Sequence, residues 1–126
     1  MPDTFEFDNA IAVHKYWLRH LELFIRGIEF DASEMSEVGN SRHCALGKWL
    51  GACAEQLSTL TGFTRLTEVH EVFHATAAEI LRLVRNGQAA AAEYLLTGRL
   101  AELSAEMLRL LEALKRESQA RAKKSP

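Results

Sequence analysis

The sequence has little that would interrupt a helix and nothing long enough to span a membrane. Its two prolines stand at positions 2 and 126, so no proline breaks a helix between the ends of the 126 residues. The longest uninterrupted apolar runs are four residues, at 10–13 and 89–92, whereas a membrane-spanning helix needs about 20. We therefore expect a soluble protein with no membrane contact, in which long helices are permitted.

Neither sign of charge dominates. The 15 basic and 17 acidic residues give a formal net charge of -2, which is too balanced for a nucleic-acid-binding protein. The first residues are acidic and lack the basic, then apolar pattern of a secretion signal, so we expect a cytoplasmic protein. Basic residues gather only near the end, between Lys115 and Lys124. We expect residues 1–115 to form one domain and residues 116–126 to be a basic tail or linker.

Cysteine is scarce as well. Only Cys44 and Cys53 are present, and in a reducing compartment a pair of cysteines serves as ligands, redox sites or core residues rather than as a disulfide. A chain of this length with 48% hydrophobic residues buries enough apolar surface to fold without disulfides. The cysteines are therefore candidates for chemistry rather than for stabilisation.

Apolar residues recur with the helical period, and no segment alternates with the period of two that a strand requires. The segment Phe30 to Arg42 is rich in Ser, Asp, Asn and Gly and is typical of a loop, and Thr97-Gly98 is a candidate break in the last helical stretch. The pattern predicts an all-α fold, an antiparallel four-helix bundle with an additional short helix that carries a Cys-x-Leu-Gly-x-Trp motif. The predicted long helical stretches are Thr4 to Phe30, Phe63 to Asn86 and Gln88 to about Arg121, and the short helix lies in HCALGKWLGAC.

Three of the five histidines fall on apolar faces of these helices. His14 lies in the middle of the first apolar stripe, and His70 and His74 stand four apart on one face of another helix. Burying such groups without partners would be costly. With Cys44 as a thiolate they would complete a tetrahedral zinc site of three nitrogens and one sulfur. Hydrogen-bonded core histidines are also common, and the residues alone leave both interpretations open.

Three segments resemble a known family. AIAVHKYWL, then Cys44-Ala45-Leu46-Gly47-Lys48-Trp49-Leu50, then LTEVHEVFH are similar to the chemoreceptor zinc-binding (CZB) domain, over about residues 8–115. The resemblance implies that His14, Cys44, His70 and His74 bind Zn²⁺. It further implies a non-enzymatic helical bundle that senses zinc or oxidants and controls bacterial signalling.

The same resemblance implies partners. Its output modules, a chemoreceptor signalling region or a diguanylate cyclase, work as dimers, so we expect a homodimer whose output domain is supplied in cis or in trans. The nearly all-round apolar first helix agrees with a dimer, because such a helix should bury two faces. From a length of 126 residues we expect no output domain within this sequence. The alternative is a freestanding zinc-binding or buffering protein.

Two metalloprotein classes compete for these histidines. The run His70-Glu71-Val72-Phe73-His74 matches the HExxH pattern of zinc peptidases, but a catalytic zinc needs an open position that His14 and Cys44 would fill. Ferritin-like and hemerythrin-like iron sites need more inward histidines or Glu-x-x-His units than this sequence offers. We therefore expect no enzymatic activity. Cys53 is expected in the core, and His20 and His43 are expected not to be ligands.

Overall fold

A computed structural model describes residues 2–26 and 44–124, and within them the fold is all-α, as predicted. The predicted loop at 30–42 and the end of the first predicted helix lie outside the described residues. No described helix is long and apolar enough to cross a membrane. The helices are α1 (Thr4–Ile25), α3 (Ala45–Ala52), α4 (Ala54–Leu57), α5 (Phe63–Arg85), α6 (Ala89–Leu95), the π-helical η1 (Leu96–Leu100) and α7 (Ala101–Lys124).

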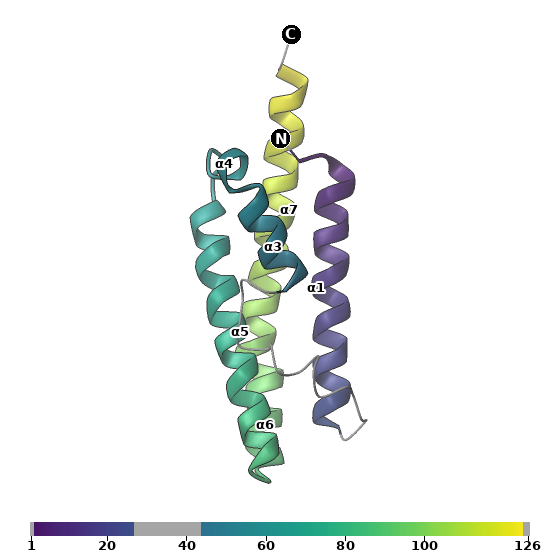
Figure 1. The fold of residues 1–126 in the computed structure, drawn as a ribbon, viewed down its shortest axis with the longest axis vertical. Helices are drawn as coiled ribbons and strands as arrows, with labels where there is room; N and C mark the ends of the chain where they lie inside the picture. Colours follow the sequence, from purple (N-terminus) through teal and green to yellow (C-terminus); the bar gives the residue numbers. More distant parts are fainter. Residues whose placement is uncertain (1, 27–43, 125–126) are drawn as a thin grey trace.

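The helices form an elongated bundle (Figure 1). α1 and α5 run in one direction, and the rod made by α6, η1 and α7 returns in the other and packs against both. α3 runs antiparallel to α1 and rests mainly on it (Figure 1). This arrangement brings the short motif helix beside the middle of the two long helices that carry the histidines.

Local sequence signals explain where the helices begin and end. Asp3 caps α1, since its Oδ1 accepts the N–H of Glu6 at 2.9 Å while the Glu6 carboxylate accepts the N–H of Asp3 at 3.0 Å. α5 ends in a left-handed turn, because Asn86 is its C-cap and Gly87 has a φ of +74°. Both signals are short-range, which is why the sequence reveals them.

The candidate break at Thr97-Gly98 is instead a π-helical segment inside a continuous rod. η1 covers Leu96–Leu100 and joins α6 to α7 without a loop. A π-helical turn takes up about one extra residue, which rotates the following helix by roughly 100° relative to the preceding one. Leu96 and Leu100 both remain buried. The segment thus determines which face of α7 meets the core.

The core runs the length of the bundle and draws on every long helix. Its side chains are aliphatic or aromatic, but three histidines and two serines are buried among them. Core residues exposed by less than 2% include Phe7 and Leu21 of α1, Leu57 of α4, Leu66, Phe73 and Ile80 of α5, and Leu100, Leu103, Met107, Leu111 and Leu114 of η1 and α7.

α7 continues through the segment where the sequence predicts a basic tail or linker. Ser118 is buried and donates its hydroxyl to the Pro2 carbonyl at 3.2 Å, and Lys115 pairs with Asp8 at 2.7 Å. The side chain of Gln119 donates to Thr4 Oγ1 at 2.9 Å. These contacts hold the end of α7 against the start of α1.

Candidate metal centre

Cys44 is placed by the start of α3. It is the N-cap of that helix, in extended backbone geometry, and its Sγ accepts the N–H of Gly47 at 3.1 Å. A side chain at this position meets the unpaired N–H groups and the positive end of the helix dipole, which favour a thiolate. The local structure therefore explains the spacing of Cys and Gly in the motif. Cys44 is the N-cap of α3, and Gly47, three residues later, supplies the N–H that its sulfur accepts.

Trp49 and Leu46 secure α3 against the bundle. Leu46 is buried, and the ring of Trp49 packs edge-on against Phe7 of α1 with centroids 5.3 Å apart. The indole Nε1 of Trp49 is buried without a hydrogen-bond partner in the described part of the chain. Trp49 thus contributes apolar packing.

His70 and His74 lie one turn apart on the inner face of α5. Both are buried, with 3% of each residue exposed, and their ring centroids are 4.7 Å apart. Cys44 Sγ lies 3.2 Å from His70 Nε2, and one ligand atom from each of the three residues lies within 4.8 Å of the others. Neighbouring ligands of a tetrahedral zinc are roughly 3.3–3.7 Å apart. The donor set fits zinc, and the distance between Cys44 and His70 is close to this spacing, although the 4.8 Å limit for the whole group is wider.

His14 is buried beside this group but does not belong to it. Its Nε2 lies 2.8 Å from Ser104 Oγ on α7, and its ring packs 4.9 Å from that of Phe73. The structure thus brings three of the four predicted ligands together, while the fourth, from α1, contacts a serine. That His14 is the fourth ligand stays a prediction.

Burial makes these histidines neutral. It lowers the pKa of His14 to about 4, with a further contribution from His74, and lowers the pKa of His70 to about 3, with contributions from His74 and His14. Burial also raises the pKa of the Cys44 thiol, against the opposing effect of the Gly47 N–H. Neutral imidazoles are the form that binds a metal, and a metal cation would favour the Cys44 thiolate.

These shifts predict that the metal-free protein loses stability in mild acid. In the unfolded chain the two histidines take up protons near pH 6.5, but in the folded protein only near pH 4 and 3. The unfolded state therefore binds more protons below pH 6.5, and the free energy of unfolding should fall by up to about 1.4 kcal/mol per pH unit for each histidine. Urea unfolding in a chelator at pH 7, 6 and 5 measures this slope, and equal stability at pH 7 and 5 would contradict it.

Aromatic rings from α1 and α5 pack against the donor group. Trp17 of α1 packs against His74 at 5.4 Å and against Phe73 at 5.7 Å between ring centroids. Sequence reasoning missed Trp17, Phe73 and Ser104 as neighbours of the site. The only available signal for Ser104 was a serine within the apolar stripe of the last helix.

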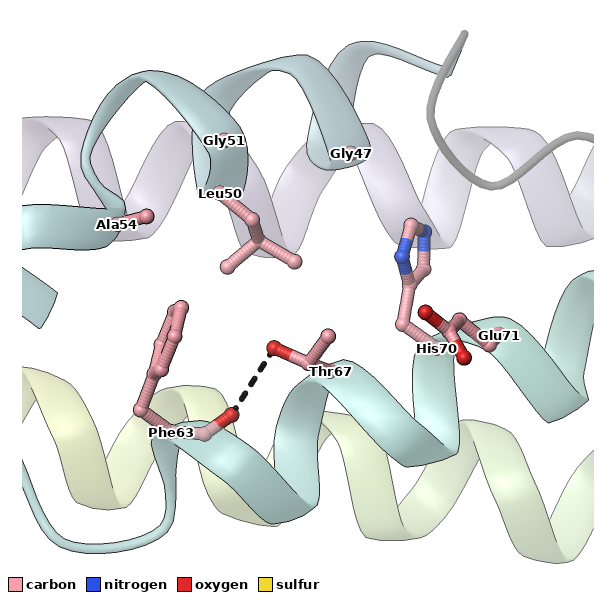
Figure 2. A pocket seen from close by; sticks show the side chains of 8 residues that line it. All are labelled: Gly47, Leu50, Gly51, Ala54, Phe63, Thr67, His70 and Glu71. Atoms are coloured by element: carbon pink, nitrogen blue, oxygen red, sulfur yellow. Dashed lines mark hydrogen bonds between the residues drawn. The ribbon is translucent and has the colours of Figure 1, made fainter. Parts of the chain in front are cut away.

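A cavity of about 330 Å³ lies between α3 and α5 next to the group. Figure 2 shows Leu50 pointing across it from α3, Phe63 at one end, and His70 with Glu71 at the other. Glu71 is exposed, so it stands at the cavity rim rather than beside the metal-binding atoms. Beside this cavity, the contact between Cys44 and His70 links the start of α3 to α5.

Cys53 and His20 lie outside the donor group. Cys53 ends α3, begins α4 and is half-buried against the core, and it is not part of the donor group. His20 is half-buried, with its ring 4.3 Å from that of Tyr16. His43 lies outside the described residues.

The fold and the donor set define a helical metal-binding domain. The profile of the chemoreceptor zinc-binding domain matches residues 14–81, more than half of the chain, and the chain belongs to this family. The family is one of regulatory sensors rather than of catalysts. The matched segment begins at His14 and contains Cys44, His70 and His74, while α6, η1 and α7 lie beyond it. No curated protein and no solved structure matches the chain.

Proposed function

We propose that this chain is a zinc-binding sensor domain whose site is formed by His14, Cys44, His70 and His74. It responds to zinc, to oxidants or to both, and controls bacterial signalling through a chemotaxis receptor or through cyclic-di-GMP synthesis. The observation that carries the proposal is the approach of Cys44 Sγ to His70 Nε2 at 3.2 Å, with His74 in the same group. This donor set joins α3 to α5.

The packing of α3 supports a regulatory role. α3 rests mainly on α1, and a cavity separates much of it from α5. A bound zinc would supply a link between Cys44 on one helix and the histidines on the other, and would keep the sulfur as thiolate. Occupancy of the site therefore determines how firmly α3 is held, which is the structural signal in this proposal.

Oxidation offers a second input at the same sulfur. A thiolate that attacks hydrogen peroxide displaces hydroxide and becomes a sulfenic acid, a far weaker ligand. Peroxide should therefore release zinc, which a colorimetric chelator detects, and should speed amide exchange in α3. Cys53→Ala should release zinc as the parent protein does. Mass spectrometry should confirm that peroxide oxidises Cys44. If zinc nevertheless stays bound, the oxidant input is overturned and zinc remains as the signal.

A homodimer and an output partner complete the proposal. α1 exposes two large side chains, Phe5 at 77% and Tyr16 at 67%, which a second copy of the chain would cover. The output domain, a chemoreceptor signalling region or a diguanylate cyclase, acts in cis or in trans. Sedimentation velocity at tens of micromolar tests the dimer, and a monomer there would count against it.

A peptidase would leave a different signature. Glu71 follows His70 in sequence but is exposed at the cavity rim. A peptidase assay with and without zinc tests this alternative. Metal-dependent proteolysis by the parent protein that Glu71→Gln abolishes would show that the domain is a peptidase and would overturn the sensor proposal.

A further inference from the structure

Ser104 is a buried polar residue on the largely apolar buried face of α7. It is 4% exposed, the same fraction as His14, and its Oγ lies 2.8 Å from His14 Nε2. Its neighbours Leu100, Leu103 and Met107 are all buried. Buried hydroxyls and imidazoles need hydrogen-bond partners, so the pair satisfies both groups at once. The two residues are 90 positions apart, and the contact exists only because α1 and α7 pack together.

A neutral imidazole has one protonated nitrogen and one bare nitrogen, and only the bare nitrogen binds a metal. To bind zinc, His14 must be in this neutral form. If Nε2–H donates to Ser104 Oγ, Nδ1 is the bare nitrogen. If the serine hydroxyl donates to Nε2 instead, Nδ1 carries the proton and the ring has no nitrogen left for zinc.

The register of α7 determines where the serine points. η1 ends at Leu100, and Ser104 follows one turn later on the same buried line. Since a π-helical turn rotates the helix that follows it, η1 sets the face of α7 that meets α1. The Ser104 hydroxyl is therefore held in place by the packed core around it. A group that orients a metal ligand needs such a fixed position, which a mobile loop would not provide.

We propose that Ser104 is a positioning residue of the metal centre. Its Oγ accepts the Nε2–H of His14 and so holds His14 in the tautomer whose Nδ1 is free to bind zinc. This inference rests on the proposed zinc site, and it deepens that site by adding α7. Metal-ligating histidines commonly donate their second N–H to an oxygen in this way.

The first test needs no metal. Long-range ¹⁵N–¹H correlation spectra of the metal-free protein report which nitrogen of His14 carries the proton. We expect the Nε2–H tautomer in the parent protein and a mixture of both tautomers in Ser104→Ala. An Nδ1–H tautomer in the parent protein would overturn the proposal, because Nδ1 would then not be available.

The second test measures zinc affinity by competition with a chelator. Ser104→Ala should weaken binding about 10–100-fold, the range found when an orienting partner of a metal ligand is removed. The matched control is Ser118→Ala, which removes the other buried serine of α7, one that donates to Pro2 rather than to a histidine. The control should leave affinity unchanged even if it lowers the melting temperature as much.

The outcomes separate this inference from the proposed function. Equal affinity in Ser104→Ala and Ser118→Ala would overturn the role of Ser104. Tighter binding in Ser104→Ala would overturn it too, since the serine would then compete with zinc for His14. A parent protein that binds no zinc would instead reject the proposed function, while the tautomer spectra would still report on the pair.

Discussion

Replacing Cys44 or His74 with alanine is expected to remove one bound zinc per chain. Each change deletes a metal-binding atom from a group in which these atoms lie within 4.8 Å of one another. Loss of an orienting partner alone typically costs 10–100-fold in affinity, so loss of a ligand should cost at least about 100-fold. Metal analysis after dialysis against a weak chelator should show about one zinc per chain in the parent protein and almost none in either variant.

The chain offers a matched control for each of these variants. Cys53→Ala removes the other cysteine, which is half-buried on the core and outside the donor group. His20→Ala removes a histidine of α1 that packs against Tyr16. Both controls should keep their zinc. Unchanged zinc content in Cys44→Ala and His74→Ala would refute their assignment as ligands.

Zinc should also stabilise the bundle strongly. A ligand that binds only the folded state stabilises it by about 4 kcal/mol when its free concentration is 1,000-fold above Kd. For a chain of 126 residues, this corresponds to a rise in melting temperature of roughly 15 °C. The rise is expected because ligation would fasten α3 to α5 next to a cavity that otherwise separates them. Thermal unfolding by circular dichroism, with and without zinc, measures it.

The stabilisation should depend on the ligands and be reversible. A strong chelator should return the melting temperature to its metal-free value. Cys44→Ala should show little rise at the same zinc concentration, whereas Cys53→Ala should match the parent protein. An equal rise in Cys44→Ala would mean that zinc binds elsewhere on the surface.

Much of the fold follows from local patterns in the sequence. The start of α1 is encoded by the reciprocal cap of Asp3 and Glu6, and the end of α5 by Asn86-Gly87. η1 could not be foreseen, because Thr97-Gly98 has the composition of a break and only packing against the core keeps the rod continuous. The helical period predicts a helix to about Arg121, but the packing of its last turns on the start of α1 was hidden for the same reason.

The histidine pair of the donor group was accessible because its spacing is local, whereas Cys44, 26 residues from His70, was assigned to the group by the family resemblance. His70 and His74 are one helical turn apart, and Cys44 lies in a short motif that also explains its own helix cap. Ser104 was not accessible. Its contact with His14 spans 90 residues and depends on the packing of α1 against α7, which no short-range pattern specifies.

X-ray absorption at the zinc edge of protein purified without added metal tests the central claim most directly. The account predicts one sulfur at about 2.3 Å and three nitrogens at about 2.0–2.1 Å from a four-coordinate zinc, with the sulfur signal lost in Cys44→Ala. A zinc surrounded by nitrogen and oxygen alone, or a protein purified with iron in place of zinc, would contradict it.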